Sequence, residues 1–220
     1  MCGRYAITVT WEKLQQLLAG THQGEVPVPV PLPSFNVAPT QAVPVLSDTG
    51  MSFMRWGIPA PWEIKKGKEP GKARPLVNAQ AEKLEKWPWM FHFKERRAVV
   101  PATDWYEWIT VDGDKRPVRH SAPDGGLLYL AAIWQQNKVL GPCVAVLTVQ
   151  ANHRAARVHH RMPALLTRDE ATAWIEAPNA QLARTVEDDR FVQTAANTAV
   201  NSYRNNAPAV LEGDWELPWD

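Results

Sequence analysis

The sequence has few of the residues that build disulfide-rich or metal-based frameworks. Only two of its 220 residues are cysteine, Cys2 and Cys143, which excludes a disulfide framework and a CxxC metal site. No run of 18 or more apolar residues occurs, which excludes a transmembrane helix of the usual length. The first residues also lack the basic and then apolar pattern of a signal peptide. We therefore expect a cytoplasmic protein with no membrane partner.

Tyrosine and phenylalanine are scarce as well, with 4 and 5 residues, whereas tryptophan reaches 11 and proline 19. Otherwise the composition, 45% hydrophobic and 21% charged, is typical of a globular protein. Frequent proline favours short elements and extended segments over a helical bundle. The length fits one large domain, and we expect a single domain over residues 1–220.

The net charge of +1 hides an uneven distribution along the chain. Residues 51–120 hold 14 basic and 9 acidic residues, while residues 121–220 hold 8 basic and 11 acidic ones. A basic middle region permits a face that binds a polyanion, although solvated charges scattered over the surface are the alternative interpretation. The acidic residues from Glu212 to Asp220 predict a loose tail that begins at about residue 206.

Local patterns predict more strands than helices. Helices are expected over residues 10–19, where Thr10 can cap the first turn, from the capping box at 167–170, and over 179–186. Strands are expected over 53–58, 99–111, 127–134 and 143–149, with a hairpin turn at Asp112-Gly113, an extended segment over 26–33 and a mobile loop over 64–72. This pattern predicts an α+β fold, a mainly antiparallel and barrel-like sheet flanked by a few helices.

Position 2 is the most informative for chemistry. If Met1 is removed, Cys2 presents a thiol and an α-amine on adjacent carbons, and both have a nucleophilic fraction near neutral pH. Such a 1,2-aminothiol can attack an amide, with its own amine as the base. It can also condense with an aldehyde, first as an imine and then as a closed thiazolidine ring. A cysteine that follows Met by chance remains the alternative.

Two further segments contain groups suited to proton transfer. Glu107 lies among aromatic residues in Trp105-Tyr106-Glu107-Trp108, where loss of hydration raises a carboxyl pKa, although a structural Glu at a rim is equally compatible with this segment. In His159-His160-Arg161, one histidine can act as a general acid or base, and Arg161 can hold a phosphate. No Cys or acidic residue stands at ligand spacing from this pair, so we expect no metal site.

Taken together and in order, short segments of the chain resemble the SRAP (SOS-response-associated peptidase) family. No single segment is specific, but the ordered set spans residues 1 to about 205. The matching segments are Met1-Cys2-Gly3-Arg4-Tyr5, Phe35-Asn36-Val37-Ala38-Pro39-Thr40, Arg55-Trp56-Gly57-Ile58, Asn78-Ala79-Gln80-Ala81-Glu82, Trp105-Tyr106-Glu107-Trp108, Leu147-Thr148 with Ala151-Asn152, Val158-His159-His160-Arg161-Met162-Pro163, and Val200-Asn201-Ser202.

The resemblance implies a protein that senses abasic sites in single-stranded DNA and forms a thiazolidine crosslink with them. This crosslink shields the lesion for repair. The implied activity is lyase-like DNA processing and uses no cofactor. By motif, Cys2 is the nucleophile and Glu107 moves protons. Asn78 orients the amine or the sugar, and His159 matches the active-site histidine. The DNA-binding residues implied are Arg4, Gln80, Arg161, Thr148 and Trp62.

One departure and one competing function accompany this resemblance. Many relatives have Arg where this chain has Gln80, which puts one phosphate contact in doubt. The same Cys2, Glu107 and His159 also suit an N-terminal-nucleophile peptidase, whose minimal reaction is the autocatalytic removal of Met1. Besides abasic single-stranded DNA, the resemblance implies replication-fork proteins as partners. We expect a monomer, associated with the nucleoid if the source is bacterial.

Overall fold

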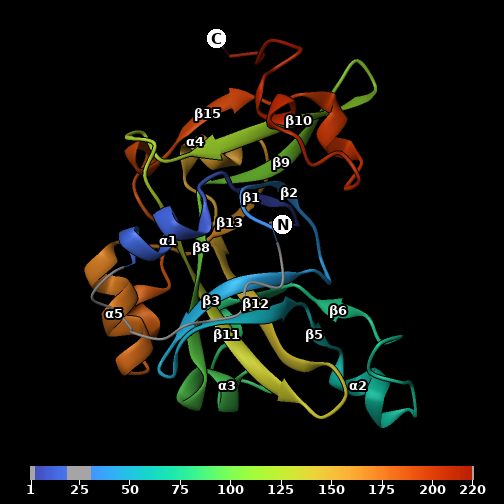
Figure 1. The fold of residues 1–220 in the computed structure, drawn as a ribbon, viewed down its shortest axis with the longest axis vertical. Helices are drawn as coiled ribbons and strands as arrows, with labels where there is room; N and C mark the ends of the chain where they lie inside the picture. Colours follow the sequence, from blue (N-terminus) through green and yellow to red (C-terminus); the bar gives the residue numbers. More distant parts are fainter. Residues whose placement is uncertain (1–2, 19–30, 220) are drawn as a thin grey trace.

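Two β-sheets form the centre of the protein, and the larger one closes into a barrel beneath the smaller one (Figure 1). The computed structural model describes residues 3–18 and 31–219. The barrel is a ring in which each strand pairs with the next, and β12 pairs with both β4 and β11 to close it. Its strands are β3 (Ala42–Ser47), β4 (Gly50–Trp56), β8 (Arg97–Ala102), β11 (Leu128–Asn137) and β12 (Gly141–Gln150).

Shorter strands extend the barrel at its edges. Most pairings are antiparallel, but β12 runs parallel to both β4 and β7. The added strands are β7 (Asn78–Gln80), β13 (Arg161–Pro163) and β14 (Leu165–Leu166), while β5 (Ile58–Pro59) and β6 (Pro75–Leu76) form a separate pair. The expected α+β fold with a mainly antiparallel, barrel-like sheet is therefore confirmed.

The smaller sheet contains the N-terminal strand. Its order is β15-β10-β9-β1-β2, so β1 lies between β9 and β2. The strands are β1 (Tyr5–Ile7), β2 (Ser34–Val37), β9 (Asp104–Val111), β10 (Asp114–Ser121) and β15 (Val192–Ala195). The β9–β10 hairpin turns at Asp112 and Gly113, both with positive φ, as the Asp-Gly signal predicts.

The helices are short and lie on the outside of the sheets. They are α1 (Trp11–Leu17), α2 (Pro61–Lys65), α3 (Met90–Glu95), α4 (His153–Ala156) and α5 (Arg168–Glu176), with 3-10 turns η1 (Ala81–Lys83), η2 (Ala180–Leu182), η3 (Asp188–Arg190), η4 (Thr198–Asn201) and η5 (Pro208–Leu211). Thr10 caps α1, and Thr167 with Glu170 forms the expected capping box of α5. Trp174 of α5 is buried, and its indole donates to the carbonyls of Ala98 and Ala132 in the barrel.

The expected single strand over 99–111 is wrong, because the chain changes sheets at Thr103. β8 belongs to the barrel, and β9 belongs to the smaller sheet. The Thr103 N–H donates to the carbonyl of Ala6 at 2.9 Å, and its hydroxyl donates to Asp104 Oδ2 at 2.6 Å. The contact with Ala6 of β1 holds the bend, and a periodicity of two along the sequence does not reveal it.

The tail beyond residue 206 also differs from the expected loose segment. Val210 and Leu217 are buried, with 2% and 4% of their surfaces exposed. Asp214 accepts hydrogen bonds from the N–H and the hydroxyl of Thr198, and the Trp215 indole donates to the carbonyl of Ala196. The buried side chains of Val210 and Leu217, together with these hydrogen bonds, therefore hold this segment against the smaller sheet.

Three other local expectations have mixed outcomes. The loop over 64–72, which was expected to be mobile, is held by two contacts with Glu63. The Glu63 Oε2 atom lies 2.7 Å from Lys68 Nζ and accepts a hydrogen bond from the Arg74 N–H. The helix expected over 179–186 is reduced to the single turn η2. Most of the extended segment expected over 26–33 lies outside the described residues.

Candidate functional site

Four of the predicted site residues project from one face of the barrel sheet. Thr148 of β12 pairs with Gln80 of β7 on one side and with Pro163 of β13 on the other. Residues two apart on a strand, and residues that pair across strands, share a face of a sheet. Asn78, Gln80, Thr148 and Arg161 therefore share one face. Thr148 is fully buried, and the other three are partly exposed.

Arg161 is held in place by a two-point ion pair. Its Nη1 and Nη2 atoms lie 2.8 and 2.9 Å from the two carboxylate oxygens of Glu82, and Nη2 also donates to the Thr148 carbonyl. The hydrogen bond from Arg161 holds the pKa of the Glu82 carboxyl below its usual value. The pair joins η1 to β13 and fixes the direction of the guanidinium.

His159 precedes β13 in the turn after α4. Its Nδ1 accepts a hydrogen bond from the Arg161 N–H at 2.9 Å. Nδ1 also lies 3.2 Å from the Arg161 carbonyl. Because the contact with the N–H is shorter and a backbone N–H can only donate, we assign the proton of the neutral ring to Nε2. Burial lowers the pKa of the His159 imidazole, which favours this neutral form. The ring stacks on that of His160, with centroids 4.3 Å apart.

Glu107 lies on β9 of the smaller sheet, where only 6% of its surface is exposed. Burial raises the pKa of its carboxyl, as the flanking aromatic residues predict. The N-terminal strand runs antiparallel beside it. Tyr5 pairs with Trp105, and the Tyr106 N–H donates to the Arg4 carbonyl at 3.0 Å. The same register sets Gly3 opposite Glu107. Cys2, the predicted nucleophile, lies outside the described residues.

Trp56 connects the N-terminal strand to the strand that contains Asn78. The Trp56 ring is fully buried and packs edge-on against the Tyr5 ring, with centroids 5.1 Å apart. Its indole N–H donates to the carbonyl of Val77, the residue before Asn78, at 3.0 Å. The next residue, Gly57, has φ +124°, and a Cβ there would lie 2.7 Å from Pro75 Cβ. Sequence reasoning assigned Trp56 no role in the site.

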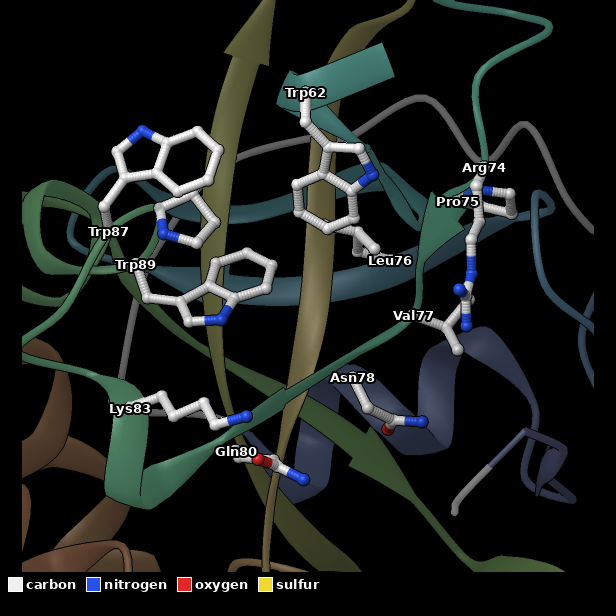
Figure 2. A pocket seen from close by; sticks show the side chains of 11 residues that line it. Trp62, Arg74, Pro75, Leu76, Val77, Asn78, Gln80, Lys83, Trp87 and Trp89 are labelled. Carbon is white, nitrogen blue, oxygen red and sulfur yellow. The ribbon is translucent and has the colours of Figure 1, made fainter.

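A pocket of about 380 Å³ opens beside Asn78 and Gln80. Figure 2 shows Trp62, Trp87 and Trp89 gathered along one side of it, across from Asn78, Gln80 and Lys83. The Trp62 and Trp87 rings lie 6.1 Å apart, and their surfaces are 38% and 60% exposed. An exposed aromatic wall opposite polar and cationic groups suits a ligand with flat rings and negative charge.

Trp87 and Lys83 were missed by sequence reasoning, which proposed only Trp62 for an aromatic contact. The available signal was Trp87-Pro88-Trp89 within a lysine-containing stretch. Lys65 also lies over the Trp87 ring, 5.2 Å from its centroid. Arg4, the remaining predicted DNA-binding residue, lies apart from this pocket on the smaller sheet, where its Nη1 donates to Asn36 Oδ1.

The described residues contain neither a cluster suited to a metal ion nor a helix suited to a membrane span. Within residues 3–18 and 31–219, no group of three or more His, Cys, Asp or Glu side chains is placed to hold a metal ion. Across the same described ranges, no helix is long and apolar enough to cross a membrane.

Comparison with known proteins gives consistent results. The family model described as SOS response associated peptidase (SRAP) matches residues 1–205. The chain is 26% identical to abasic site processing protein YedK of Escherichia coli, covering 96% of this chain and 99% of that protein. It is 29% identical to abasic site processing protein HMCES of Gallus gallus, covering 96% and 77%.

A solved structure of a protein from Bacteroides thetaiotaomicron shares the fold, with a TM-score of 0.80 at 19% identity, covering 97% of this chain and all of that one. The ordered motifs, the architecture and the match over residues 1–205 agree, and the chain belongs to the SRAP family.

Proposed function

We propose that this protein recognises abasic sites in single-stranded DNA and links to them covalently through Cys2 after Met1 is removed. The observation that carries the proposal is the shared face of Asn78, Gln80, Thr148 and Arg161 beside an aromatic pocket, joined through Trp56 to the N-terminal strand. The names of the relatives, abasic site processing proteins, support this choice of substrate.

The proposed reaction balances without an oxidant or a cofactor. The α-amine of Cys2 adds to the aldehyde carbon of the ring-opened abasic sugar to give a carbinolamine. Loss of water gives an imine. The Cys2 thiol then adds to the imine carbon, its proton passes to the nitrogen, and a five-membered thiazolidine closes. One water molecule is released overall, and no electrons are gained or lost.

The proposed reaction requires several proton transfers, which side chains of the protein carry out. Glu107, with its raised carboxyl pKa, donates the proton that lets hydroxide leave as water and takes up the proton that the nitrogen loses as the imine forms; when the thiol adds, Glu107 relays the thiol proton to the nitrogen. His159, neutral and protonated on Nε2, serves later proton transfers. Asn78 orients the amine or the sugar from the neighbouring sheet.

The DNA contacts are assigned to the pocket and the shared face. Trp62, with Trp87 beside it, stacks on a base, a contact that tolerates any sequence. Arg161, oriented by Glu82, holds a phosphate, and Thr148 lines the site next to it. Lys83 adds a positive charge to the pocket.

Replacing Gln80 with Arg is expected to tighten binding of single-stranded DNA and to steepen its salt dependence. Gln80 lines the pocket and shares a face with Arg161, so a cation there lies on the proposed DNA path. One added phosphate contact should increase the slope of log K against log salt by about 0.7. Equilibrium binding across a salt series measures this slope.

The control for this measurement is Gln181→Arg, which adds the same charge on η2, outside this pocket. Its slope should stay at the wild-type value. Equal changes in both variants, or none in Gln80→Arg, would place position 80 off the DNA path.

The proposed function is tested directly by intact mass after incubation with single-stranded DNA that contains one abasic site. A single adduct at the summed mass minus one water is expected from protein that has lost Met1. Hydrolysis of peptides by protein that forms no adduct would instead favour the peptidase reaction.

A further inference from the structure

Asn36, on β2 beside the N-terminal strand, joins distant parts of the chain. Only 1% of its surface is exposed. Its Nδ2 lies 3.3, 2.9 and 2.7 Å from the carbonyls of Val200, Ser202 and Asn205, so its two protons are shared among three acceptors. Its Oδ1 accepts from Arg4 Nη1 at 2.6 Å. The amide therefore has residues 200–206, the C-terminal segment, on one side and the start of the chain on the other.

Arg4 is fixed through both its side chain and its backbone. Its Nη1 donates a second hydrogen bond to the Val200 carbonyl at 2.8 Å, so Arg4 and Asn36 share that acceptor. Its own carbonyl accepts from the N–H of Tyr106, the residue before Glu107. Burial lowers the pKa of the guanidinium, as expected for a half-buried cation held by neutral oxygens.

The C-terminal segment is itself fastened to β2. Asn206 Oδ1 accepts from the N–H groups of Phe35 and Asn36 at 2.6 and 2.9 Å. Asn201, in the same segment, accepts from the Trp108 indole at 2.6 Å, next to Glu107 on β9. Asn206 lies just beyond residues 1–205, the part that the family model matches.

We propose that Asn36 is a positioning residue, which acts through Arg4 to lock the first strand to the C-terminal segment and so fixes the direction in which the chain leads toward Cys2. This inference rests on the proposed function of Cys2. Residues at a chain end are otherwise poorly ordered. A nucleophile two residues beyond such a lock reaches its target in a narrower range of orientations, which raises the reaction rate of the bound complex.

The test compares Asn36→Ala, Arg4→Ala and the double variant. At saturating abasic DNA, Asn36→Ala is expected to slow adduct formation by about tenfold or more, the scale of a misplaced reacting group. The DNA concentration for half-maximal rate should stay unchanged. Because Asn36 acts through Arg4, the double variant should be no slower than Arg4→Ala. Fully additive losses would overturn the proposal.

A matched control separates positioning from general destabilisation. Asn137→Ala removes an Asn whose Oδ1 accepts from the N–H groups of Val139 and Leu140 in the β11–β12 turn. It should form the adduct at the wild-type rate. If Asn36→Ala does not fold, Asn206→Ala keeps Asn36 and loosens the segment behind it, and it should slow the reaction in the same way.

Hydrogen exchange without DNA tests the lock independently of the chemistry. Asn36→Ala should speed exchange of the β1 and β2 amides and leave the barrel strand β11 unchanged. Unchanged exchange in β1 together with an unchanged adduct rate would overturn the proposal. If wild-type protein forms no adduct, the proposed function fails, and exchange alone then decides whether the lock exists.

Discussion

Replacing Cys2 with alanine or serine is expected to abolish the heat-stable adduct with abasic-site DNA while the fold is kept. An aldehyde reacts with any exposed amine, so imine formation alone does not require a thiol. The imine hydrolyses reversibly, and a thiol on the adjacent carbon removes it from this exchange by closing the five-membered ring. Both variants should therefore give, at most, a transient imine that borohydride traps. Intact mass and denaturing gels after heating, without reductant, measure the stable product.

Two further forms of the protein test whether this result is specific to the N-terminal aminothiol. Protein that retains Met1 should lose the adduct as completely as Cys2→Ala, because its reactive amine is a peptide nitrogen. Cys143→Ala should react like wild type. Cys143 is buried in β12, and burial raises the pKa of its thiol to about 11, which leaves it unreactive. A full yield of stable adduct from a tagged protein with Met1 intact would exclude the thiazolidine mechanism.

The parts of the fold that could be predicted are those encoded by neighbouring residues. Thr10 before α1, the capping box at Thr167 and the Asp112-Gly113 turn each act within a few residues, and all three are confirmed. The bend at Thr103 depends on a hydrogen bond to Ala6, which is distant in sequence. The packing of the tail beyond residue 206 depends on the burial of Val210 against distant residues. Local patterns contain neither kind of contact.

The same distinction applies to the candidate site. The sequence motifs pointed to Asn78, Thr148 and Arg161 as site residues. That the three share one face could not be predicted, because it follows from the pairing of β7 and β13 with β12, which no single segment encodes. The raised carboxyl pKa of Glu107 could be predicted, because its aromatic neighbours are adjacent in sequence. The ion pair of Arg161 with Glu82 could not, since the two lie 79 positions apart. The catalytic roles of these residues remain predictions.

Glu107→Gln is expected to slow adduct formation by roughly 10²-fold or more, the usual scale for the loss of a general acid–base group. The glutamine fills the same buried volume but cannot exchange a proton with the carbinolamine hydroxyl. Burial raises the pKa of the Glu107 carboxyl, so it remains protonated at a higher pH than an exposed Glu. The wild-type rate should therefore fall as pH rises through this shifted value, while the variant should lack that step. Single-turnover rates from pH 5 to 8 measure both effects.

Asp104→Asn is the matched control for Glu107→Gln, because it neutralises a buried carboxyl on the same strand. Burial raises the pKa of the Asp104 carboxyl too, but Asp104 contacts Thr103 and Arg119 and pairs with Ala6, further along β1 from the N-terminal end. Its variant should react within a few-fold of wild type. His159→Ala should still form measurable adduct, since its role is assigned to later proton transfer. If Glu107→Gln reacted at the wild-type rate throughout pH 5 to 8, the aminothiol would be closing its ring without the carboxyl, and the proton-transfer role of Glu107 would be wrong.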